Sequence, residues 1–192
     1  MLLNFPDLLN LMLTIGLYNT YDTKKLHEAH IRAIARAAPV AYAYEFHLAL
    51  IGFPFDSDDP KEVAERVAST TTIGEGGKYL LELAKSNKFH LLDFPKRGFP
   101  PQFGEVIATT SKPSKEKVIG SREVAEMALR GKSLMLIIGL GRHGLPKEVF
   151  EISKYHLDIT DGREISLETC TAIGIIPARI KTLMEALKWK KP

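Results

Sequence analysis

The sequence predicts an α/β protein with a mainly parallel sheet flanked by helices, and three observations support this fold class. Short apolar and β-branched runs alternate with amphipathic segments along the chain. Glycine and proline turns separate most of these runs. The chain has 192 residues, of which 45% are hydrophobic, so it can bury one substantial core. We therefore expect a single domain over residues 1–192.

The first half of the chain is expected to alternate strands with helices. Pro39 ends the helical periodicity that precedes it, because proline lacks the amide hydrogen that a helix interior needs. Asp59 can cap a helix that has Pro60 in its first turn. The expected elements are a strand at residues 11–17, a helix at 24–38, a strand within 40–52, and helices beginning at Pro60 and at Tyr79.

The second half repeats this alternation after a loop at residues 94–104, which contains three prolines and two glycines. Ser121 can cap a helix that Gly131 ends. Pro177 starts or interrupts the final helix. The expected elements are strands at residues 105–110, 134–138 and 155–159, and helices at 122–130, at 146–153 and from the region of Pro177 to about residue 188.

Composition narrows the function only slightly. The formal net charge of +3 permits nucleic-acid binding without requiring it. The single cysteine, Cys170, excludes an internal disulfide framework and a cysteine-rich zinc site. The histidines lack the HxxxH spacing of a metal site, so we expect no metal.

The apolar N-terminal segment carries no basic region and no small-residue cleavage site of a signal peptide. No window reaches the roughly 18 uninterrupted apolar residues of a membrane span. We therefore expect a cytoplasmic protein with no membrane partner.

The strongest local pattern is an apolar run, residues 134–138, that leads into Gly139, Gly141 and Gly144. Such a run predicts a buried strand, and the glycines let the backbone turn sharply and approach a ligand. The spacing also satisfies the GxGxxG dinucleotide fingerprint. That fingerprint usually opens a nucleotide-binding sheet, whereas only residues 145–192 follow here. A nicotinamide site is therefore disfavoured, and the alternative to a ligand loop is a tight strand–helix turn.

Two other segments, residues 106–111 and 165–175, share this design, in which a short strand ends in a loop of small or hydroxyl-bearing residues. The ordered set contains a Thr/Ser loop, a G-x-x-x-x-G-L-P loop at residues 139–146, and an S-L-x-x-x-x-A helix start at residues 166–172. Over residues 105–180 this order resembles the SPOUT superfamily of S-adenosylmethionine-dependent RNA methyltransferases. The chain resembles an archaeal-type member of that superfamily.

The resemblance implies a C-terminal deep trefoil knot, a homodimer and S-adenosyl-L-methionine as cofactor. Glycine-rich loops suit this cofactor because they expose backbone groups to the adenine edge. Leu145 and Ile173 would join the apolar residues that sandwich the adenine. The residues expected to bind the cofactor are Thr109, Thr110, Gly139, Leu140, Gly141, Gly144, Leu157, Ile159, Ser166, Leu167 and Ala172.

Members that methylate the ribose 2′-hydroxyl carry N-x-G-x-x-x-R on the first helix, and Arg36 matches the arginine. His30 stands where the asparagine is expected, although Asn19 could substitute for it in space. The resemblance thus implies tRNA ribose 2′-O-methylation, with methylation of a base as the alternative. Arg36 would orient a phosphate or the accepting oxygen, and Glu168 is the candidate general base.

Three basic residues are expected to contact RNA: Lys96, Arg97 and Lys112. The first two alternate with aromatic residues at Phe94, Phe99 and Phe103, a mixture that can stack bases and hold phosphates. Simpler interpretations stay open. Ser166 can be a helix cap, Arg36 a solvated charge, and the whole chain a non-catalytic protein that binds RNA or a partner.

Overall fold

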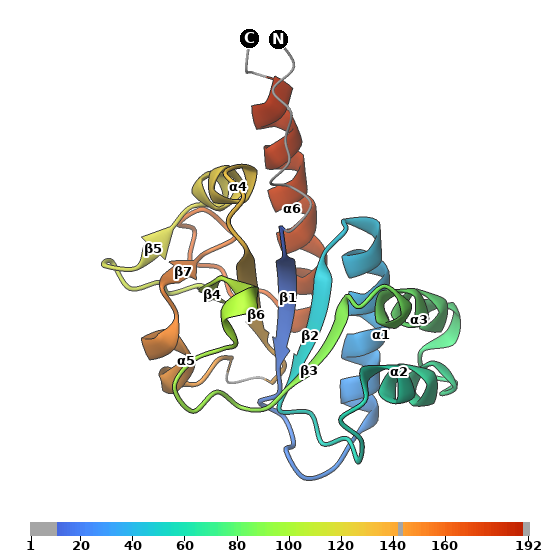
Figure 1. Cartoon of the computed structure of the whole chain (residues 1–192). Helices are drawn as coiled ribbons and strands as arrows, with labels where there is room; N and C mark the ends of the chain where they lie inside the picture. Colours follow the sequence, from blue (N-terminus) through green and yellow to red (C-terminus); the bar gives the residue numbers. More distant parts are fainter. Residues whose placement is uncertain (1–10, 142–143, 190–192) are drawn as a thin grey trace.

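The structure, a computed structural model, describes residues 11–141 and 144–189. It contains a seven-stranded sheet with helices packed on it (Figure 1). In chain order the elements are β1 (Leu13–Tyr18), α1 (Glu28–Ala43), β2 (His47–Ile51), α2 (Pro60–Ala68), the 3₁₀ turn η2 (Gly74–Gly76), α3 (Gly77–Lys85), β3 (Phe89–Leu92), the 3₁₀ turn η3 (Pro101–Phe103), β4 (Glu105–Thr109), β5 (Val118–Ile119), α4 (Ser121–Leu129), β6 (Leu134–Gly139), α5 (Lys147–Ile152), β7 (Tyr155–Leu157) and α6 (Thr169–Trp189).

Every strand pairing in the sheet is parallel, which confirms the predicted α/β class. The strand order is β3-β2-β1-β6-β4-β7-β5. Successive strands first move outward from β1 to β3, and the chain then crosses to the other half of the sheet. The order therefore changes direction beside β1, and in open parallel sheets ligands bind at the carboxyl ends of the strands near such a point.

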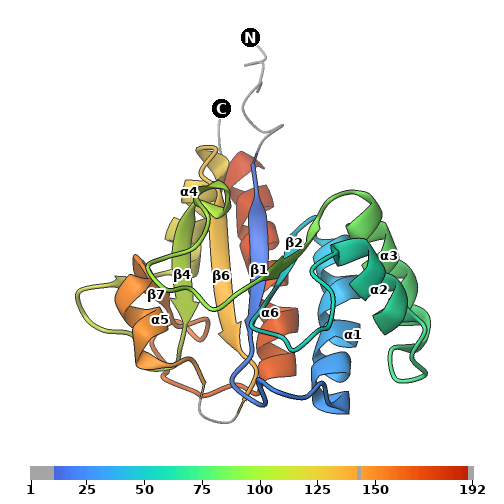
Figure 2. The ribbon, with the colours of Figure 1, turned by 60° about the horizontal axis from the view of Figure 1, so that its bottom comes forward.

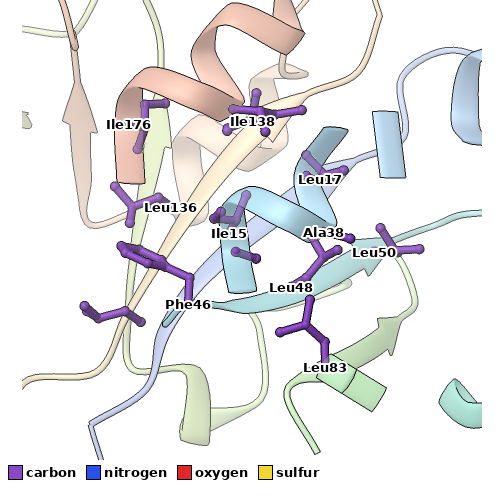
Figure 3. Close-up of a cluster of buried hydrophobic side chains, with 14 of the residues drawn as sticks. Ile15, Leu17, Ala38, Phe46, Leu48, Leu50, Leu83, Leu136, Ile138 and Ile176 are labelled. Atoms are coloured by element: carbon purple, nitrogen blue, oxygen red, sulfur yellow. The ribbon is translucent and has the colours of Figure 1, made fainter. Parts of the chain in front are cut away.

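One face of the sheet carries the larger core. Figure 3 shows side chains of β1, β2 and β6 facing those of α1, α3 and α6. The apolar stretch Leu134–Ile138 of β6 is buried throughout, as expected for a central strand covered on both faces. The labelled residues of this core are Ile15, Leu17, Ala38, Phe46, Leu48, Leu50, Leu83, Leu136, Ile138 and Ile176.

The opposite face is covered by α5 and by the segment that joins β3 to β4. Figure 2 shows this segment passing across β1 and β6. Phe103 is fully buried in the second core cluster, and the ring of Phe94 packs 5.1 Å from that of Tyr18. The proline-rich loop is thus a strap across the sheet, here defined as residues 93–104.

The structure differs from the sequence predictions at two prolines and at two short strands. Pro177 does not start the final helix, because α6 begins at Thr169 and contains this proline. Pro39 does not end a helix, because α1 continues to Ala43. Burial of Ala37, Ala38 and Ala41 favours continuing the helix despite the cost of an interior proline. Strands β3 and β5 were not predicted, since each is too short to show a clear alternating pattern.

Candidate active site

A cavity of about 760 Å³ lies at the carboxyl edge of the sheet. The ends of β4, β6 and β7, the start of α6 and one side of α1 enclose it. This volume is in the range of small-molecule and cofactor sites. Of the residues that the sequence suggested for cofactor binding and catalysis, all but Ile173 line it, namely Thr109, Thr110, Gly139, Leu140, Gly141, Gly144, Leu145, Leu157, Ile159, Ser166, Leu167, Ala172, Arg36 and Glu168.

The described glycines at and after the end of β6 occupy constrained positions. A Cβ on Gly139 would lie 2.7 Å from the carbonyl carbon of Gly144, so only glycine fits without a backbone shift. Gly144 has a φ of +67°, which side chains other than glycine rarely adopt. The backbone amide of Gly141 donates to Thr20 Oγ1 over 2.7 Å, and Thr169 Oγ1 donates to the carbonyl of Gly139 over 2.9 Å. Gly139 and Gly141 are therefore held between the residues that follow β1 and the start of α6.

The loop between β7 and α6 is organised by Asp158, which the sequence analysis did not single out. Its buried carboxylate accepts hydrogen bonds from the backbone amides of Thr160, Gly162 and Glu164, at 2.8 to 3.2 Å, and from the Thr160 hydroxyl. These bonds hold the pKa of Asp158 below its usual value although burial opposes the shift. The D-x-T-x-G spacing at residues 158–162 is typical of an aspartate turn and could have indicated this role of Asp158 from the sequence.

The residues expected on the cavity wall differ in their hydrogen bonds and in their exposure. Thr109 Oγ1 donates to the carbonyl of Ile137 over 2.8 Å and so ties β4 to β6. Ser166 is exposed and lies two residues before the N-cap position of α6, so it does not cap that helix. Ile173, expected beside the adenine, is instead fully buried in the core and does not line the cavity.

The two candidate catalytic residues approach the cavity from different elements. Arg36 extends from α1, and its Nη1 donates to Cys170 Sγ over 2.8 Å. Glu168 is exposed at the cavity wall, just before α6 begins. An exposed guanidinium and an exposed carboxylate thus line the same cavity.

His30 and Asn19 form a separate buried unit outside the cavity lining. His30 Nδ1 accepts the backbone amide of His27 over 2.9 Å, so Nε2 carries the proton that it shares with Asn19 Oδ1 over 3.1 Å. Burial, and then the nearby His27, lower the pKa of His30. Asn19 Nδ2 also donates to the carbonyls of Asp22 and Gly52. The hydrogen bonds of both side chains therefore stabilise the fold.

The three basic residues expected at RNA do not line the cavity. Lys96 and Arg97 are exposed on the strap, and Lys112 is exposed just after the β4 loop. The prediction that Phe103 stacks on RNA bases is wrong, because its ring is buried in the core. In the same basic run as Lys112, Lys117 is structural, because its Nζ donates to three carbonyls at the end of α5.

Within the described parts of the chain, no three histidine, cysteine or acidic side chains are grouped as a metal would require. In residues 11–141 and 144–189, no helix combines the length and hydropathy that crossing a membrane demands.

Comparison with known proteins gives a family and a fold. The family model described as "Protein of unknown function (DUF531)" matches residues 13–181. "Uncharacterized protein MJ0224" of Methanocaldococcus jannaschii is 49% identical over 168 residues, which cover 88% of this chain and 92% of that protein.

The solved structures that match include a probable methylase family protein from Haemophilus influenzae Rd KW20. It has a TM-score of 0.63 at 18% identity, over 95% of this chain and 70% of that one. A structure concerned with the 2-OH methylation of C/U34 on tRNA matches with a TM-score of 0.56 at 17% identity, over 92% and 99% of the two chains. The resemblance to SPOUT methyltransferases is confirmed as a shared fold.

Proposed function

We propose that this chain, which belongs to the DUF531 family, is an S-adenosylmethionine-dependent methyltransferase that acts on the ribose 2′-oxygen of a tRNA. One observation carries the proposal: three loops that are separate in the sequence converge on one cavity at the carboxyl edge of the sheet. The fold is shared with a methylase family protein and with a protein linked to 2-OH methylation of tRNA.

The cavity fits this cofactor by size and by lining. Its volume of about 760 Å³ lies within the range of cofactor sites. Gly141 and Gly144 leave the loop backbone accessible, and a Cβ on Gly144 would project into open space. The apolar lining that could flank an adenine ring is provided by Leu140, Leu145, Leu157, Ile159 and Leu167.

The bound cofactor supplies a methyl group on a sulfonium, which is reactive enough that the protein mainly positions the acceptor and removes one proton. Arg36 would orient the acceptor or its phosphate through its planar fork of donors, while Cys170 Sγ steadies one end of the guanidinium. Glu168 would accept the proton of the ribose hydroxyl. Thr109, Thr110, Ser166 and Ala172 complete the proposed cofactor contacts.

Base methylation is the second candidate, and His30 favours it. The asparagine expected for ribose methylation is replaced, and both His30 and Asn19 are occupied by structural hydrogen bonds. Nucleoside analysis of methylated tRNA distinguishes the two reactions, because a sugar-methylated nucleoside and a methylated base separate chromatographically.

The proposal includes the knotted C-terminal half, about residues 105–180, within a single domain, and a cytoplasmic homodimer. Exposed Lys96, Arg97 and Lys112 are assigned to outer RNA contacts. Light scattering tests the dimer, and the chain trace of a crystal structure tests the knot.

The deciding experiment measures transfer of radiolabelled methyl to unfractionated tRNA. Calorimetry with S-adenosylmethionine and NAD in parallel tests the cofactor. Arg36→Gln should retain cofactor binding and lose transfer by at least about 100-fold, because positioning is a large part of the rate. Cofactor binding without transfer to any RNA would favour a non-catalytic binding protein.

A further inference from the structure

A second, shallower groove of about 480 Å³ adjoins the outer side of α1. Its lining consists of Glu28, Arg32, Ala35, Arg36 and Thr72, the last from the turn between α2 and η2. Among the described residues, Arg32 and Arg36 line both this groove and the large cavity. The two arginines therefore stand at the boundary between them.

The lining of the groove is polar and contains two arginines. Only Ala35 in its lining is apolar, so the groove cannot bury a hydrophobic ligand. Arg32 and Arg36 are one helical turn apart and project from the same side of α1. Thr72 also lines the groove. Guanidinium groups bind phosphate oxygens through paired hydrogen bonds, so the two arginines suit a phosphate.

Arg32 is available to exchange partners. Its Nη2 donates to Glu28 over 2.6 Å, but the two side chains are 58% and 68% exposed. An ion pair exposed to this degree contributes little, since solvent screens it. Arg36, in contrast, already contacts Cys170 on the cavity side. A phosphate in the groove would therefore meet Arg32 first.

Methyl transfer constrains where the substrate enters. The accepting atom must come within roughly 3–3.5 Å of the methyl group, so the substrate must reach the edge of the cofactor cavity. The boundary formed by Arg32 and Arg36 is such an edge. We propose that the groove beside α1 holds a phosphodiester of the RNA next to the target nucleotide, with Arg32 as its anchor. This inference rests on the proposed function and adds a residue and a site to it.

The test measures binding of unfractionated tRNA at several salt concentrations, with S-adenosylhomocysteine present. Arg32→Gln should weaken binding about tenfold and reduce the slope of log affinity against log salt by about 1, because one phosphate contact is lost. Glu28→Gln should strengthen binding about twofold to threefold, since it removes the competing carboxylate. Thr72→Val should weaken it about threefold.

Arg66→Gln is the matched control. Arg66 lies on α2, is 56% exposed and pairs with Asp56, which precedes that helix. It lines neither hollow, so its loss should leave tRNA affinity and salt slope unchanged. Equal effects of Arg32→Gln and Arg66→Gln would overturn the assignment, as would inorganic phosphate binding to Arg32 without any tRNA effect.

Cofactor titration separates this proposal from the function it rests on. Glu28→Gln, Thr72→Val and Arg66→Gln alter residues outside the lining of the large cavity and should bind S-adenosylmethionine like the unaltered protein. Lack of cofactor binding by the unaltered protein would contradict the proposed function. Normal cofactor binding together with normal tRNA affinity and salt slope in Arg32→Gln would contradict only the groove.

Discussion

The carboxyl edge of the sheet is open in one half and sealed in the other. At the ends of β4, β6 and β7, loops leave a cavity of about 760 Å³. At the ends of β1 and β2, Asn19 fills its hydrogen-bonding capacity, and a Cβ on Gly52 would lie 2.1 Å from the Phe94 ring. Parallel strands bring loops together at an edge, but the packing of each loop decides whether a ligand can enter.

The sealed half depends on the buried hydrogen bonds of Asn19 and on the Phe94 ring over Gly52. The open half depends on glycines and on the hydrogen bonds that Thr20 and Thr169 make to the residues after β6. Changes in the sealed half should therefore alter stability and spare the cofactor affinity of the folded protein. Changes in the open half should do the reverse.

The largest expected effect is in the sealed half. Asn19→Ala should lower the free energy of unfolding by about 3 kcal/mol, because the buried His30 Nε2 and the Gly52 carbonyl lose their partner. Urea unfolding measures the loss. A double-mutant cycle with His30→Ala should show coupling of about 1 kcal/mol or more. Additive effects of the two substitutions would mean that the observed contact is not stabilising.

The open half should respond most strongly at Gly139. Gly139→Ala should weaken S-adenosylmethionine binding at least about 30-fold, equivalent to about 2 kcal/mol, because its Cβ would push the backbone of Gly144. Gly174→Ala is the control, since a Cβ at that helical position has open space. Equal cofactor affinity of the two variants would show that the loop after β6 does not hold the cofactor.

Acid should weaken the amino ends of β2 and β3, at the edge of the sheet opposite the cavity. His47 on β2 lies 2.9 Å, Nδ1 to Nε2, from His90 on β3, and burial together with that neighbour and Lys88 lowers the pKa of His47 to about 4. The unfolded chain binds the proton near pH 6.5, so the folded state loses stability as the pH falls from about 6.5 to 4. We expect about 1.5 kcal/mol, reduced for solvent screening at a half-buried ring.

Denaturant midpoints at pH 7, 5.5 and 4.5 measure this slope, and His47→Gln should flatten it. Asp22 does not contribute in this window. Its pKa is lowered to about 2, mainly by the Lys24 backbone amide and by His27, so its contribution is lost only between about pH 4 and 2. An unchanged slope in His47→Gln would remove the histidine pair as the cause.

The sequence predicted the open half better than the sealed half. The glycines at Gly139 and Gly144 answer local requirements, a close backbone approach and a positive φ, so their spacing is visible in the chain itself. The order of the three loops then placed them at one edge, because the strands are parallel.

What the sequence could not show are the contacts between distant residues. The bond from Asn19 to His30 spans 11 positions, and that from Thr169 to Gly139 spans 30. The strap is predicted to be an RNA loop because its aromatic residues alternate with basic ones. Only the tertiary fold shows that Phe103, one of the strap residues, is buried in the second core cluster. The prediction that a helix ends at Pro39 is wrong for the same reason, because tertiary burial of the helix outweighs the local effect of the proline.

The smallest predicted effect tests how the two sides of the open half are joined. Thr169→Val keeps the shape of the side chain but removes the hydrogen bond from Oγ1 to the carbonyl of Gly139. Cofactor affinity should fall about fivefold, equivalent to about 1 kcal/mol. Thr171→Val, at an exposed position two residues later on α6, should leave it unchanged. A loss of stability without loss of affinity in Thr169→Val would place this bond with the sealed half, as scaffold.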